Sequence, residues 1–135
     1  QSVRWHGRFE IVKVKPRVIL DGAHNPSKIT ALVQTFDALQ IPRTRIICLF
    51  CCKLTKDAPA MLRRLAPRCR ELIYPRLASV PNLVPPGDLQ GIAPGRSAGS
   101  LHAALNQASA LARRSDTILL TGSLTLVGEY KRQFP

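Results

Sequence analysis

Residues 17–26 read RVILDGAHNP, and this stretch decides the fold class. The apolar run that begins at Arg17 stops abruptly after Leu20, at Asp21-Gly22, which is typical of a buried parallel strand. Asn25 and Pro26 then begin a helix, because Asn is a favoured N-cap and Pro fits the first helical position. A buried strand followed closely by a helix is the unit from which α/β folds are built.

The same alternation continues along the chain. Further strands are expected over 45–50, 71–74 and 117–121, and further helices over 57–65 and 100–113. Pro42 ends the first helix, whose apolar residues recur at helical spacing at Ile29, Leu32, Val33, Phe36 and Leu39. The Pro- and Gly-rich segment 81–99 is expected to be a loop with one helical turn near Asp88-Leu89. The pattern predicts one α/β domain over residues 1–135, a Rossmann-like, mostly parallel sheet with helices on both faces.

Length and composition support one folded domain. The chain has 135 residues, of which 45% are hydrophobic and 21% charged, so it is not a disordered tail. It has neither a transmembrane run nor a signal-peptide pattern, and we expect a cytoplasmic protein. A chain that opens with Gln1 and enters a strand pattern within about ten residues is interpreted as a piece of something longer.

The charge is strongly positive. Lys and Arg number 20 against 8 Asp and Glu, a formal net charge of +12. Such a balance predicts an anionic partner: a nucleotide, a polyanionic substrate, an acidic neighbouring domain or a nucleic acid. Nucleic acid has less support, because aromatic residues are only 5% of the chain and the cations are scattered along it.

The four cysteines are interpreted as structural. Cys48 and Cys51 form a Cys-x-x-Cys pattern inside an apolar run, and Cys52 and Cys69 complete the set. Neither a second such pair nor a spaced His pair accompanies them, so no metal site is predicted. Free cysteines in a reducing compartment behave as small apolar residues.

Two strand ends carry polar residues that a plain turn does not need. The first places Asp21, His24 and the amide-rich start of a helix together, where phosphate could bind. The alternative is that Asp21 and Asn25 only shape the turn and cap the helix, with His24 exposed beside them. The second is Thr121-Gly122-Ser123-Leu124, where Ser123 either binds a ligand or caps a following helix.

Arg8, in the segment Trp5-His6-Gly7-Arg8-Phe9, is either a site cation or a solvated surface residue. The sequence contains neither a G-x-x-x-x-G-K-[ST] phosphate loop nor G-x-G-x-x-G. If this domain contacts a nucleotide, another part of the protein must supply the phosphate cradle.

Three ordered segments together carry a family resemblance. They are Trp5–Glu10, Ile19–Pro26 and Thr121–Glu129, and they span almost the whole chain. In this order they resemble the C-terminal domain of folylpolyglutamate synthases, including the bifunctional dihydrofolate synthase form, in the Mur ligase superfamily. Lys56-Asp57 followed by Met61-Leu62 also resembles a family segment, whereas Pro81-Asn82-Leu83 departs from the family's Pro-Arg-Ala.

The resemblance implies an ATP-dependent ligase that adds glutamate to folate or dihydropteroate through an acyl phosphate. An N-terminal ATP-binding domain outside this chain would hold ATP, Mg²⁺ and the folate, and the protein would be a monomer. Arg8 would reach the nucleotide phosphates, and Asn25 would lie beside the nucleotide. Asp21 and His24 would serve catalysis near the phosphates and the incoming L-glutamate, and Ser123 would hold the glutamate carboxylate.

Two other functions remain open at this point. One is a free-standing nucleotide- or anion-binding module without catalysis. The other is a basic nucleic-acid-binding domain, which the strong salt dependence of its binding would reveal.

Overall fold

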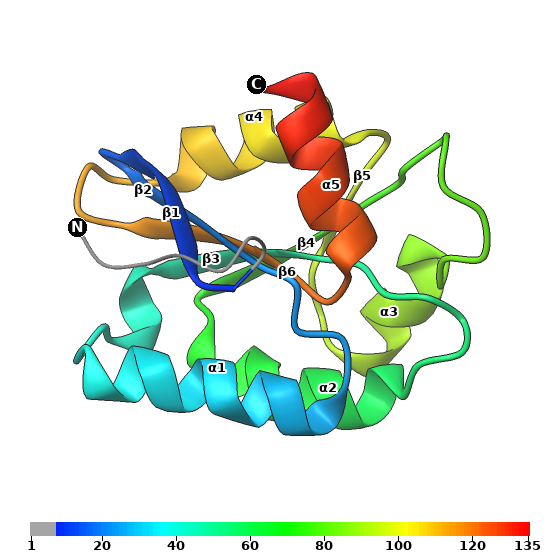
Figure 1. The fold of residues 1–135 in the computed structure, drawn as a ribbon, viewed down its shortest axis with the longest axis horizontal. Coiled ribbons are helices and arrows are strands. Elements are labelled where there is room, and N and C mark those ends of the chain that lie inside the picture. Colours follow the sequence, from blue (N-terminus) through cyan, green and yellow to red (C-terminus); the bar gives the residue numbers. More distant parts are fainter. Residues whose placement is uncertain (1–7) are drawn as a thin grey trace.

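The computed structural model describes residues 8–135 and contains one six-stranded sheet in that range (Figure 1). The spatial order is β1-β2-β6-β3-β4-β5. β1 runs antiparallel to β2, and every other neighbouring pair is parallel. The strands are β1 (Glu10–Val14), β2 (Arg17–Asp21), β3 (Ile46–Phe50), β4 (Glu71–Pro75), β5 (Arg96–Ala98) and β6 (Thr117–Thr121).

Helices cover both faces of this sheet, as Figure 1 shows. α1 (Pro26–Ala38), α2 (Ala58–Leu65) and α3 (Pro86–Ile92) pack on one face, and α4 (Leu101–Leu111) and α5 (Leu124–Gln133) pack on the other. Two short 3₁₀ turns, Arg43–Arg45 and Ala66–Arg68, complete the regular structure. The predicted Rossmann-like α/β fold is confirmed.

The core is divided into two layers because strand side chains alternate between the faces of the sheet. On the first face, Ile19 and Leu119 pack with Phe36 and the α2 residues. On the second face, Leu20 and Leu120 pack against α4 and α5. The predicted inward residues Met61, Leu62 and Leu65 are fully buried. None of the helices in residues 8–135 is long and apolar enough to cross a membrane.

α1 begins as the sequence predicts. Asn25 is the N-cap, and its side-chain oxygen accepts a hydrogen bond from the Lys28 amide at 2.8 Å. Pro26 occupies the first turn, where its missing amide costs nothing. Leu39, the last apolar residue in the predicted helical spacing, is the C-cap of α1 and is 51% exposed.

The segment 81–99 is more ordered than the sequence predicts. Instead of one turn it holds the two-turn helix α3 and the edge strand β5. Tertiary contacts order it: the buried Tyr74 hydroxyl donates to the Ala93 carbonyl at 2.7 Å. Gly95 passes so close to the Tyr74 ring that a Cβ would lie 2.7 Å from it. Contacts with β4 therefore override the loop-forming composition.

All four cysteines are buried and free, as predicted. Burial raises the pKa of the Cys51 thiol to about 12 and that of Cys52 to about 11. Thiols with such values carry little thiolate at neutral pH and are therefore poor nucleophiles and metal ligands. They act as small core residues.

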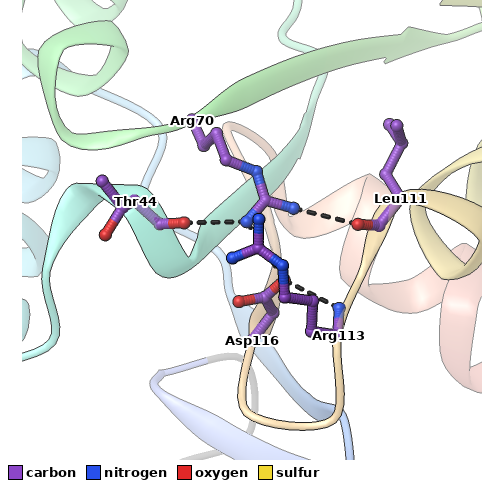
Figure 2. A network of polar contacts seen from close by, with 5 residues as sticks. All are labelled: Thr44, Arg70, Leu111, Arg113 and Asp116. Carbon is purple, nitrogen blue, oxygen red and sulfur yellow. Dashed lines mark hydrogen bonds and ion pairs between the residues drawn. The ribbon is translucent and has the colours of Figure 1, made fainter.

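Arg70 and its hydrogen-bond partners lie at the amino-terminal ends of the parallel strands (Figure 2). We call this group, which consists of Thr44, Arg70, Leu111, Arg113 and Asp116, the polar clamp. The Arg70 guanidinium donates to the carbonyls of Thr44 at 2.8 Å and Leu111 at 3.0 Å, and to the Asp116 carboxylate at 3.1 Å. The Arg113 amide donates to the same carboxylate oxygen at 2.8 Å. One side chain thus joins the segment before β3, the end of α4 and the start of β6.

Asp116 is the buried member of this clamp, and its side chain is 0% exposed. Burial opposes its ionisation, but the hydrogen bond from the Arg113 amide and the Arg70 guanidinium outweigh it. The pKa of the Asp116 carboxyl therefore lies below its ordinary value. Because the folded state binds this proton more weakly than the unfolded state, the carboxylate stabilises the fold above the unfolded pKa of about 3.9. That contribution is lost as the pH falls through the folded pKa.

We expect Asp116→Asn to lower the free energy of unfolding at pH 7 by about 2–4 kcal/mol, because it leaves a largely buried guanidinium without its counter-charge. Urea unfolding at pH 7 and at pH 3 would measure this. The difference between variant and wild type should shrink at pH 3, where the Asp116 contribution is itself being lost.

Glu71→Gln is the matched control, because it breaks the more exposed ion pair between Glu71 of β4 and Arg96 of β5. It should cost less than about 1 kcal/mol. Equal losses for the two variants would contradict the role given to the clamp.

Candidate functional site

The candidate site lies where three neighbouring strands end together. In the sheet register, Asp21 of β2 pairs with Thr121 of β6, which pairs with Phe50 of β3. The chain leaves β2 toward α1 on one face and leaves β6 toward α5 on the other. Where adjacent parallel strands send their connections to opposite faces, a crevice opens at the carboxyl ends of the strands.

A groove of about 570 Å³ lies beside this crevice. We call it the carboxyl-edge groove. Its walls come from the segment before β1, the loop after β2, one side of α1 and the start of α5. The lining residues are Arg8, Phe9, Asp21, Gly22, Ala23, His24, Lys28, Ala31, Leu32, Thr35 and Leu124.

Asp21 is half-buried at the base of this site and holds two chain segments together. Its two carboxylate oxygens accept the amides of Phe9 and Ala23, each at 2.9 Å. Burial raises the pKa of the Asp21 carboxyl, although the two amides and the nearby cations Arg8 and Lys28 act in the opposite direction. Asp21 thus fixes the turn, as the alternative interpretation holds, while it also lines the groove.

His24 lies on the same loop and also lines the groove. Its Nδ1 is 3.0 Å from the Gly22 carbonyl oxygen. A carbonyl oxygen can only accept, so Nδ1 carries the proton in this arrangement. In the neutral ring Nε2 is then the acceptor, available to a ligand's N–H or O–H group.

Asn25 and Ser123 adjoin the groove without lining it. Both act as helix N-caps: Asn25 caps α1, and the Ser123 hydroxyl accepts the Thr125 amide of α5 at 3.0 Å. Ser123 is 3% exposed, and its neighbour Leu124 is the residue that reaches the groove. The structure therefore brings Arg8, Asp21 and His24 to one surface and gives Asn25 and Ser123 capping bonds beside it. Trp5, His6 and Gly7 of the first motif lie outside the described residues.

Gly122 makes the close approach of β6 to β3 possible. Its φ of +106° lies in the region that favours glycine. A Cβ built there would lie 2.2 Å from the Cys51 carbonyl oxygen and 2.7 Å from the Phe50 ring. Only glycine fits between these neighbours, so the turn that leads to Ser123 requires it.

Sequence reasoning missed three features of the site. Lys28 and Leu124 line the groove, and Thr121 has a buried hydroxyl without a hydrogen-bond partner among residues 8–135. A signal for Lys28 was present, because a cation in a helix's first turn is electrostatically unfavourable there. Leu124 and Thr121 follow from tertiary placement, which the sequence does not display.

The groove does not form a cage for a divalent metal. Its one carboxylate, Asp21, already accepts an amide at each oxygen. Within residues 8–135, no group of three or more His, Cys, Asp or Glu side chains could hold an ion. The side chains of residues 8–135 therefore do not provide a Mg²⁺ site of their own.

Comparison with known proteins finds one family over most of the chain. The family model described as "Mur ligase, glutamate ligase domain" matches residues 7–124. The dihydrofolate synthase/folylpolyglutamate synthase of Escherichia coli K12 is 34% identical over 127 residues, covering 90% of this chain and 28% of that protein. A probable bifunctional folylpolyglutamate synthase/dihydropteroate synthase of Halobacterium salinarum is 29% identical, covering 99% of this chain and 17% of that protein.

Solved structures agree with these sequence matches. FolC of E. coli, solved with ADP and without folate substrate, superimposes with a TM-score of 0.87 at 29% identity. The superposition includes 96% of this chain and 31% of the E. coli protein. The bifunctional Yersinia pestis enzyme with Mn, AMPPNP and L-glutamate bound has a TM-score of 0.85 at 26% identity, covering 100% of this chain and 33% of its own. The chain therefore spans about a third or less of the length of these relatives.

We expect Gly122→Ala to destabilise the domain by at least about 2 kcal/mol, because it adds backbone strain and a steric clash at the base of the site. Gly128→Ala is the matched control, since Gly128 lies in α5 with open space around it. That change should stabilise by about 0.5–1 kcal/mol through helix propensity. Thermal melts of both variants measure the difference. A Gly122→Ala variant with the wild-type melting temperature would contradict the close approach of Gly122 to Cys51 and Phe50.

Proposed function

Because the chain belongs to the Mur ligase glutamate ligase domain family, we propose that it is the C-terminal domain of an ATP-dependent ligase. The ligase adds L-glutamate to a folate or a dihydropteroate. ATP and Mg²⁺ are bound mainly by an N-terminal domain of the same protein, which this chain does not include. The buried, free cysteines suit the cytoplasm, where thiols stay reduced.

The observation that carries the proposal is the carboxyl-edge groove. Residues from separate parts of the sequence, Arg8, Asp21 and His24, meet on one surface at the crevice between β2 and β6. The related enzymes named above were solved with ADP or with AMPPNP, Mn and L-glutamate. ADP, AMPPNP and L-glutamate are anionic, and the groove of this chain presents cations and a helix N-terminus.

In the proposed reaction, a substrate carboxylate attacks the γ-phosphorus of ATP, and ADP leaves. The amine of glutamate then attacks the acyl carbon, phosphate leaves, and the amine loses a proton as the amide forms. Arg8 lowers the repulsion between anionic groups by neutralising phosphate charge. His24 Nε2 accepts a hydrogen bond from the incoming amine, and the Asp21 carboxylate holds the loop that positions His24.

The other two proposed binding residues, Asn25 and Ser123, are helix N-caps. Asn25 lies beside the nucleotide, with its oxygen engaged by the α1 cap and its side-chain N–H₂ group free to donate. The Ser123 hydroxyl accepts the Thr125 amide and can still donate its own proton to the glutamate carboxylate. Closure of the two domains would exclude water from the acyl phosphate, which water would otherwise hydrolyse.

The first test separates this domain from an autonomous enzyme. The 135-residue chain alone should show no glutamate-dependent ADP release, because it lacks a phosphate loop. Its Kd for a nucleotide should be about 1 mM at best, which corresponds to a binding free energy of about −4 kcal/mol. The same chain joined to its N-terminal domain should catalyse glutamate-dependent ADP release with a folate substrate. Turnover by the chain alone, or none by the longer protein, would contradict the proposal.

The second test compares Asp21→Ala with His24→Ala in the longer protein. Asp21→Ala should cost about 2 kcal/mol of stability, because it leaves two amides without their acceptor. His24→Ala should cost less than about 1 kcal/mol. Both should reduce ligation at least tenfold, measured by ADP release well below the melting temperature. Wild-type activity in the folded His24→Ala variant would contradict the proposed role of His24 in ligation.

A further inference from the structure

Lys28 is a cation in an unfavourable place. It lies in the first turn of α1, where the aligned peptide dipoles leave partial positive charge. The first turn contains no acidic residue that would offset it. Its backbone amide is used by the Asn25 cap, but its side chain is exposed and lines the carboxyl-edge groove.

No local partner accounts for this side chain. Within residues 8–135, five acidic residues form ion pairs, each with a cation other than Lys28: Glu10, Asp37, Glu71, Asp116 and Glu129. Asp21 is the one carboxylate that lines the groove, and its oxygens accept the amides of Phe9 and Ala23. Asp21 and Lys28 interact electrostatically, but they are too far apart to form an ion pair.

Packing does not explain it either. The buried side of α1 is formed by Ile29, Leu32 and Phe36, whereas Lys28 projects to solvent at the groove. Arg8 is a second exposed cation in the same groove. Two cations and a helix N-terminus around one engaged carboxylate leave the groove with excess positive charge, which an anionic ligand would neutralise.

We propose that Lys28 is a second anion-binding residue of this site, which works with Arg8 to hold a phosphate or carboxylate group of a substrate. This inference rests on the proposed function and adds to it a contact that Arg8, Asn25 and Ser123 do not supply. Lys suits the position because its ammonium is a compact charge on a flexible stem, able to follow an anion into the groove.

The direct test titrates the 135-residue chain with sodium tripolyphosphate and follows the amide signals of α1 by NMR. Lys28→Gln keeps a polar, unbranched side chain that is only slightly shorter, and it removes the charge. It should weaken tripolyphosphate binding at least fivefold, and rising salt should narrow the difference. Lys13→Gln is the control, because it makes the same change of net charge at an exposed β1 residue outside the groove.

Equal weakening by the two variants would reduce the effect to net charge and overturn the proposal. So would wild-type binding in Lys28→Gln, or no binding of tripolyphosphate to the wild-type chain. A thermal melt completes the test. Loss of a binding residue should leave the melting temperature within about 1 °C or raise it by about 1–4 °C, since a positive charge leaves the helix start. A lower melting temperature with unchanged binding would make Lys28 structural.

Steady-state kinetics of the longer protein identify the source of the anion. A rise of at least fivefold in KM for ATP alone assigns Lys28 to a phosphate, and a rise in KM for L-glutamate alone assigns it to a carboxylate. Unchanged KM values for both substrates overturn the proposal. Absence of ligation in the wild-type protein would instead refute the proposed function, and the tripolyphosphate titration would then decide the role of Lys28 independently.

Discussion

The structure depends on the insertion of the last strand, β6, between β2 and β3. Thr121 of β6 pairs on one side with Asp21 and on the other with Phe50, so residues far apart in the sequence end at the same level. Since β6 leads to α5 on the opposite face from α1, the crevice exists only after this strand is in place. The tight passage of Gly122 past Cys51 is the local consequence of this central position.

Polar groups lie at both ends of the parallel strands, and their charges are balanced differently at the two ends. At the amino-terminal ends of the strands, the Arg70 guanidinium donates to two carbonyls and to Oδ2 of the buried Asp116, whose Oδ1 has no hydrogen-bond partner among residues 8–135. At the carboxyl edge, Arg8 and Lys28 gather around Asp21, whose oxygens are already engaged. Charge at the amino-terminal ends of the strands is neutralised within the domain, whereas at the carboxyl ends we propose that a ligand neutralises it. On this proposal, stability and binding depend on opposite ends of the same strands.

The sequence predicted most of this fold because its strands and helix starts are local signals. The run ending at Leu20 and the cap at Asn25 needed no tertiary contact to be recognised. Segment 86–98 could not be recognised in this way, because the Tyr74 hydroxyl and the close approach of Gly95 order it from outside. The same holds for Asp21, whose partner amide at Phe9 lies twelve residues away and is brought near by the β1–β2 pairing. Local chemistry predicted which residues are polar at the site, and tertiary placement decided how they are engaged.

The excess positive charge of the chain is not what gives the groove its selectivity. Five of the eight acidic residues form ion pairs within the fold: Glu10, Asp37, Glu71, Asp116 and Glu129. The cations are scattered along the sequence, and at physiological salt their fields are screened within about 8 Å. Only cations that lie in the groove itself, such as Arg8 and Lys28, can act strongly on a bound anion. On the proposed function, the wider charge raises the rate at which anions approach, whereas the cations of the groove hold the bound anion.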